Sequence, residues 1–209
     1  SLKKQEGSYF ENKFSYTLDY DLRDQKYQTK EGIRGVFSQT IPLISDDYAI
    51  SNSYEITKWF QFDNDMIADV NFYGKTINSI NNKDVRVSSR LGLTSNRLRG
   101  FETGKLGPVD GKDYIGGNYA AALNISTTLP MLLQNFESID LKYFIDVGNV
   151  WGVDYSDIID DSNTIRSSTG LAINWFTPIG PMNFSVVQNL SKASTDKTES
   201  FQFNIGTSF

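Results

Sequence analysis

The 209-residue sequence contains neither cysteine nor histidine. A thiol nucleophile, a disulfide, a Ser-His-Asp triad and the usual kinds of zinc site therefore cannot be built from this chain. Proline is scarce, with 5 residues, and no apolar run approaches the roughly 18 residues that a transmembrane helix needs. Strands that cross a membrane remain possible, because half of their residues face water or a lumen.

Basic residues are too few to give the surface a general positive charge. The sequence has 20 Lys and Arg against 25 Asp and Glu, a formal net charge of -5, which argues against nucleic acid as a partner. The adjacent acids Asp160 and Asp161 are more typical of a solvated loop than of a catalytic pair. We therefore expect no enzymatic activity, no cofactor and no metal site.

The chain starts Ser1-Leu2-Lys3-Lys4, without Met and without an apolar signal segment. It is therefore expected to be a processed product or the C-terminal fragment of a longer protein.

The last nine residues are the most informative part of the sequence. One face of this strand carries Phe201, Phe203, Ile205 and Phe209, and the other carries Gln202, Asn204, Gly206 and Ser208. In a soluble protein such a strand would be an exposed apolar edge, which promotes aggregation. In an outer-membrane barrel it is the expected closing strand, apolar toward lipid and polar toward the lumen.

The same alternation recurs along the chain and predicts nine strands. They cover residues 14–23, 33–41, 48–57, 66–73, 118–129, 141–148, 168–175, 182–186 and 201–209. One face of successive strands carries charges of both signs, such as Asp19, Arg34 and Asp146, which suits a wet lumen. A soluble β-sandwich would place this face in bulk solvent, so the pattern alone leaves both architectures open.

The connections favour the barrel. Residues 177–181, Thr-Pro-Ile-Gly-Pro, predict a tight turn. Residues 154–163 and 191–200 predict longer polar loops, and short turns at one end with longer loops at the other are typical of outer-membrane barrels. Residues 78–117 form one long connection with seven basic and four acidic residues. A connection of this length is usually functional or disordered, although its charge alone would suit a solvated loop.

Four segments of the sequence carry a resemblance to a known family. Within the long connection, Leu98-Arg99-Gly100-Phe101, Gly107-Pro108 and Gly116-Gly117-Asn118 resemble the sixth extracellular loop of BamA-type outer-membrane assembly factors, in the surface-antigen barrel superfamily. Residues 144–151 are similar to that family's aspartate-bearing lumen strand, 175–181 to its periplasmic turn and 201–209 to its closing strand. The resemblance runs from about Phe14 to the end of the chain.

The resemblance implies an all-β fold, an antiparallel transmembrane β-barrel of 16 strands that follows periplasmic polypeptide-transport-associated domains. Residues 1–209 would be its C-terminal part, with the last nine or so strands. Residues 78–117 would be a long extracellular loop folded inward, and residues 201–209 the closing strand. The N-terminal periplasmic domains would be absent from this chain, and two sheet edges would stay unpaired.

The family's loop arginine, which meets acidic groups on the lumen wall, corresponds to Arg99, and one partner corresponds to Asp146. A second acidic wall position corresponds here to Ser126, so one acid is missing. Gly100 would allow the turn that presents Arg99 and Phe101 together. Phe101 would be a plug in the wall or a loop aromatic covering loop backbone. The supporting loop residues would be Gly107, Pro108, Gly116, Gly117 and Asn118.

The function that the resemblance implies is an insertase integral to the bacterial outer membrane. It would open a seam between its first and last strands and pair the exposed edge with unfolded client barrels by β-augmentation. The closing strand, with Phe201, Phe203, Ile205, Gly206 and Phe209, would also be its own assembly signal. Partners would be the clients, the lipid bilayer and accessory outer-membrane lipoproteins. The alternatives are a polypeptide-secretion transporter of the same superfamily and a diffusive porin.

Overall fold

The computed structural model describes residues 7–62, 65–132, 138–159, 163–177 and 180–205. The main sheet contains β1 (Glu11–Asp21), β2 (Gly32–Ser45), β3 (Ala49–Gln61), β4 (Ile67–Ser79), β7 (Tyr119–Thr128), β8 (Ile139–Trp151), β9 (Arg166–Thr177), β10 (Gly180–Ser191) and β11 (Phe201–Ile205). Gly206 and Phe209, to which the sequence assigned roles in the closing strand, lie outside the described residues.

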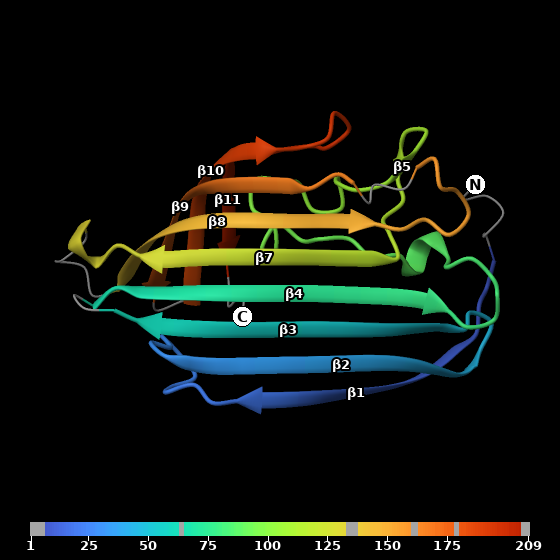
Figure 1. Ribbon diagram of the computed structural model, residues 1–209, viewed down its shortest axis with the longest axis horizontal. Helices are drawn as coiled ribbons and strands as arrows, with labels where there is room; N and C mark the ends of the chain where they lie inside the picture. The colour runs from blue at the N-terminus through green and yellow to red at the C-terminus, as the bar shows by residue number, and fades with distance from the viewer. Residues whose placement is uncertain (1–6, 63–64, 133–137, 160–162, 178–179, 206–209) are drawn as a thin grey trace.

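The nine strands follow one another in the order β1-β2-β3-β4-β7-β8-β9-β10-β11, and every neighbouring pair is antiparallel. The predicted all-β antiparallel sheet is therefore confirmed. Figure 1 shows that the sheet curves, so that β9, β10 and β11 pass behind β7 and β8. The result is a partial barrel with β1 and β11 at its edges. Among the described residues, no helix is long and apolar enough to span a membrane.

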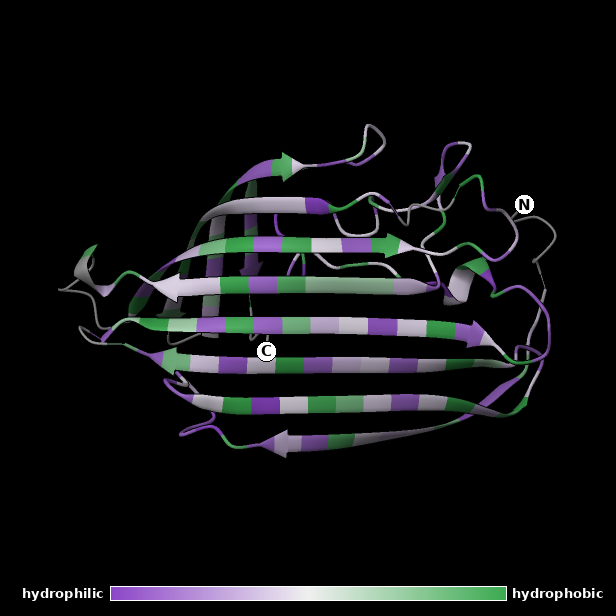
Figure 2. Cartoon of the chain, viewed as in Figure 1, coloured by the Kyte–Doolittle hydropathy of each residue, from purple (hydrophilic) through white to green (hydrophobic). Residues whose placement is uncertain are grey.

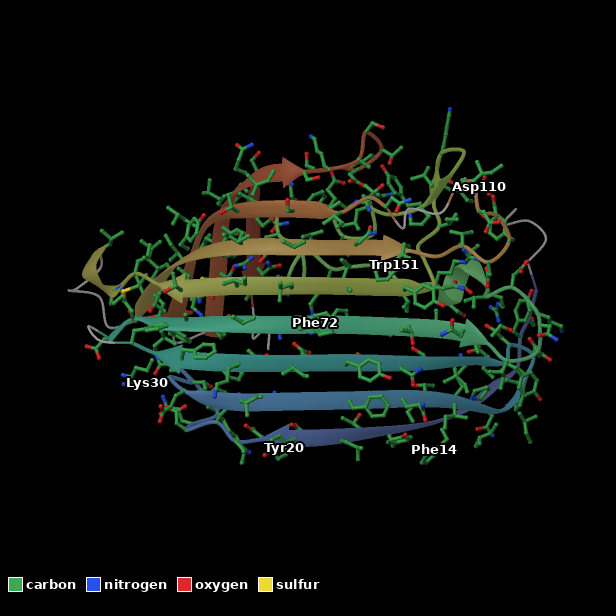
Figure 3. The ribbon with its side chains drawn as sticks, viewed as in Figure 1. Phe14, Tyr20, Lys30, Phe72, Asp110 and Trp151 are labelled. Carbon is green, nitrogen blue, oxygen red and sulfur yellow. The ribbon has the colours of Figure 1, made fainter. Side chains whose placement is uncertain are left out.

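Apolar and polar residues alternate along the strands (Figure 2). Because successive side chains of a strand point to opposite faces, the convex face is mainly apolar and the concave face mainly polar. Phe72 lies on the convex face (Figure 3) and is 46% exposed. Other exposed apolar residues of this face include Leu18, Ile56, Ile125, Ile173, Val186, Phe201 and Phe203. Buried polar residues on the concave face include Asn124, Ser126, Asp146, Ser168, Ser185 and Gln202. This arrangement is the reverse of a soluble sandwich and suits a sheet whose outer face is in lipid.

The expected division into short turns at one end and longer loops at the other holds only in part. At the end of the sheet where Thr177 of β9 pairs with Gly180 of β10, residues 22–31 form a longer connection, and the connection after β7 includes η4 (Pro130–Leu132). Residues 178 and 179 of the predicted turn lie outside the described residues. At the opposite end, residues 46–48 close β2 and β3 tightly. Amino-acid composition can predict where the chain turns. The length of each connection is harder to predict, because it depends on how far the two neighbouring strands stay paired.

The long connection comprises residues 80–118, because Asn78 and Ser79 still belong to β4. It contains η3 (Val87–Ser89) and a two-stranded hairpin of β5 (Val109–Asp110) and β6 (Asp113–Tyr114). Its apolar side chains pack against the concave face in one cluster with wall residues: Ala49, Ile77, Val85, Leu91, Leu93, Leu98, Phe101, Leu106, Ala120, Ala122 and Val150. The core of this protein therefore lies between the loop and the inner wall.

Candidate functional site

The loop turns sharply at Gly100, whose φ angle is +86°. Residues with a Cβ rarely adopt this conformation. A Cβ at this position would also lie 2.6 Å from Cγ1 of Val187 on β10. The glycine thus lets the backbone approach the wall closely, and Arg99 and Phe101 point to different partners on either side of it.

Arg99 forms a bidentate ion pair with Asp146 on β8. Its Nε and Nη2 atoms each donate to the carboxylate at 2.7 Å, and its backbone N–H donates at 3.1 Å. Asn124 on β7 donates a further hydrogen bond at 2.9 Å, and the Arg99 guanidinium lies 3.5 Å from the ring centre of Phe144. The Asp146 side chain is 0% exposed and that of Arg99 17%. Charge-assisted bidentate bonds of this kind fix orientation as well as position.

Leu98 and Phe101, on either side of Arg99 and Gly100, are both fully buried in the cluster between loop and wall. Of the two roles that the sequence left open for Phe101, its packing agrees with a plug against the wall. The loop lies on the concave side of the sheet, where its apolar side chains pack against the wall.

The backbone around Gly100 is hydrogen-bonded to the connection that leads into β11. Phe101 and Thr198 form an isolated antiparallel bridge. The Gly100 carbonyl accepts from the backbone N–H of Glu199 at 3.1 Å and from Nδ2 of Asn189 at 3.0 Å. The loop motif is therefore attached to the segment that positions the terminal strand.

The supporting residues lie further along the loop, against β8 and the residues after it. Pro108, next to Gly107, is fully buried. Gly117 exchanges backbone hydrogen bonds with Leu91, and a Cβ on Gly117 would lie 2.2 Å from the carbonyl oxygen of Trp151. Only glycine permits this approach of two backbones. Gly116 adjoins it, and Asn118 donates from Nδ2 to Asp154 at 3.2 Å.

The structure places Ser126, where the resemblance implied an acid, beside Asp69 of β4. The serine hydroxyl donates to the Asp69 carboxylate at 2.6 Å, and Nζ of Lys142 lies 3.3 Å from the same oxygen. Ser126 thus belongs to a polar group with Asp69 and Lys142, and it lies opposite Phe144 in the register of β7 and β8.

Three further ion pairs were not found from the sequence. The side chains of Arg166 and Asp196, each 0% exposed, pair at 2.8 Å and join β9 to the connection before β11. Arg90 pairs with Asp154, and Arg97 pairs with Glu55. Beside Arg90 lies Tyr155, whose pKa is raised by burial and by its hydrogen bond to Asp110. Neither spacing nor alternation signals these pairs, because the partners are far apart in the sequence.

The terminal strand β11 has the alternation that the sequence predicted over its described residues. Phe201, Phe203 and Ile205 are exposed on the convex face, and Gln202 is buried on the concave face. One edge of β11 pairs with β10 from Phe201 to Ile205. Its other edge has no partner strand within the part of the chain that the structure describes.

Comparisons with known proteins agree with this geometry. The chain is 32% identical over 139 residues to the outer membrane protein assembly factor BamA of Neisseria meningitidis, covering 54% of this chain and 17% of that protein. It is 26% identical to BamA of Neorickettsia risticii, covering all of this chain and 29% of that protein. It is 29% identical to a SAM50-like protein of Schizosaccharomyces pombe, covering 64% of this chain and 30% of that protein. The chain thus spans less than a third of these curated relatives.

The fold is similar to the crystal structure of BamA from Haemophilus ducreyi lacking POTRA domains 1-3. The TM-score is 0.83 at 22% identity, covering 91% of this chain and 41% of that one. The partial barrel is therefore of the BamA type. The Omp85 superfamily domain matches residues 1–209, and the chain belongs to the Omp85 superfamily.

Proposed function

We propose that this chain is the barrel segment of an outer-membrane insertase, which assembles client β-barrels into the membrane. The observation that carries the proposal is the docked loop. Arg99 is paired with Asp146 on the wall, and the next residues are bridged to the connection that leads into β11. A terminal strand held in this way by an internal loop can present its free edge in a defined position.

The proposed mechanism is β-augmentation at a lateral seam beside β11. A client strand would take up the unpaired N–H and C=O groups of the free edge through backbone hydrogen bonds. In lipid each unpaired backbone group costs several kcal/mol, so strand pairing is strongly favoured there. Folding of the client into the membrane supplies the driving force, and no nucleotide or catalytic residue is needed.

The proposed partners follow from this mechanism. Unfolded outer-membrane proteins are the clients, and the convex apolar face contacts the bilayer. Accessory outer-membrane lipoproteins would bind the complete protein. The relatives' names as assembly factors support the clients and the membrane setting.

Depletion of the complete native protein tests this function. The expected result is a general fall in assembled outer-membrane barrels, with unfolded chains accumulating in the periplasm. Loss of one secreted protein while barrel levels stay normal would instead mean a dedicated secretion transporter, and the insertase function would be wrong.

A further inference from the structure

The long loop meets the wall at a second point, two residues before Arg99. Arg97 forms a bidentate ion pair with Glu55 on β3, and the bond from Nη2 to Oε2 measures 2.8 Å. The guanidinium also lies 4.3 Å from the ring centre of Tyr73 on β4. The Arg97 side chain is 24% exposed and that of Glu55 27%, so both partners are largely removed from solvent.

Asn71 of β4 completes this contact. Its Nδ2 donates to Oε1 of Glu55 at 3.0 Å, and its Oδ1 accepts from Nη1 of Arg97 at 3.3 Å. The amide thus satisfies both members of the ion pair at once. Pairs in this geometry differ from ordinary surface ion pairs, because a rigid neighbour fixes both charges and little side-chain entropy is left to lose.

The two arginine contacts lie on different parts of the wall. Glu55 is on β3 and Asp146 is on β8, with β4 and β7 between them in the sheet. Asn124 on β7 links the two contacts, because its Nδ2 donates both to the Arg97 carbonyl and to Asp146, each at 2.9 Å. The two arginines thus hold the loop on separate strands, in addition to the contacts of Gly100 and Phe101 with β10 and the connection before β11.

We propose that Arg97 is a second positioning residue for the loop, with Glu55 as its partner on the wall. Arg99 fixes the loop against β8, Arg97 fixes it against β3 and β4, and the fully buried Leu98 is held between them. The effect on client assembly rests on the insertase function proposed above, but the position of the loop can be measured without it.

The test uses the complete protein in its native outer membrane, with Leu98→Cys as the only cysteine. Residues 1–209 contribute no other thiol. A small maleimide reports how often the buried position opens. We expect Arg97→Ala and Glu55→Gln each to raise the labelling rate about five- to tenfold, since each leaves a partly buried charge without its partner. The exchanged pair Arg97→Glu with Glu55→Arg should return the rate to within about twofold of the parent.

Lys112→Ala is the matched control, because it removes a positive charge from the same loop at a residue without a recorded ion pair in the described structure. Its labelling rate should equal that of the parent. Equal rates in Arg97→Ala and Lys112→Ala would overturn the proposal, and so would fast labelling in the exchanged pair. If Arg97→Ala gives no folded barrel, the exchanged pair decides: a folded, slowly labelled barrel supports the proposal, and an unfolded one refutes it.

Client assembly per folded barrel is the second measurement. Arg97→Ala should lower client assembly per folded barrel, and the exchanged pair should restore it. Because the comparison is made at equal amounts of folded protein, a loss of stability alone would not produce this difference. If depletion shows that the protein does not assemble outer-membrane barrels, the labelling result still stands or falls by itself.

Discussion

Removing Arg99 should destabilise the barrel more than removing its partner Asp146. Asp146 is 0% exposed and accepts hydrogen bonds from Arg99 and Asn124. Arg99 instead borders a cavity of about 1360 Å³ on the concave face, and Asp146 does not. In Asp146→Ala the guanidinium can turn toward this space and be hydrated. In Arg99→Ala the carboxylate has no such route.

The expected magnitudes follow from this difference. Breaking a buried ion pair by removing one partner costs about 3–5 kcal/mol when the remaining charge stays buried. Arg99→Ala should reach the lower part of this range, because Asn124 and the residue 99 N–H still donate to Asp146. Asp146→Ala should cost about 1–3 kcal/mol, the range for lost hydrogen bonds to a charged group. Arg99→Ala combined with Asp146→Asn should cost less than Arg99→Ala alone, because no buried charge remains.

The assay is urea unfolding of the complete protein refolded into lipid vesicles, with the folded fraction read from heat-modifiable migration. Arg34→Ala is the control, because Arg34 and Asp19 form a similar two-point pair on the exposed part of β1 and β2. It should change the free energy of unfolding least. An Asp146→Ala cost equal to or above that of Arg99→Ala would refute the reasoning from burial.

Three other predictions concern the glycines and the end of the chain. Gly100→Val should leave the barrel able to form but lower assembly activity, because Val187 occupies the space that a side chain needs. Full complementation by both Gly100→Val and Arg99→Ala would show that the loop has no part in the mechanism. Gly117→Ala should lower the temperature at which the folded band is lost, whereas Gly92→Ala should not, since a Cβ meets nothing within 4 Å at Gly92. Deleting Phe209 should impair the protein's own membrane assembly, and normal heat-modifiable migration of the truncated protein would contradict this.

The strands could be predicted from the sequence because each has two distinguishable faces. A one-residue shift of β8 would put Asp146 into lipid and Ile145 against the loop, so the pattern fixes which side chains face inward. The connections were less predictable. Residues 46–48 lack the glycine or proline that marks the β9–β10 turn, yet they close their hairpin tightly.

The site was predictable only where a family motif covers it. Arg99 and Asp146 came from the resemblance, and alternation independently placed Asp146 inside. Arg97 and Glu55 lie 42 positions apart. Alternation assigns Glu55 to the inner face but does not say which loop residue will stand above it. The same limit applies to Arg166 and Asp196, which meet only because the connection before β11 folds over the end of β9.

The contacts of the loop bear on how an internal segment can influence pairing at the edge of the sheet. β11 is held on one side by its ladder with β10, and the connection before it is held by backbone bonds to Gly100 and Phe101. The loop also crosses from β3 to β8 through Arg97 and Arg99. If the free edge of β11 receives the client, as proposed, the loop sets the position of that edge without touching the client. Loop variants should then lower the rate of assembly while client selectivity stays unchanged, because strand pairing itself uses backbone groups that the loop leaves free.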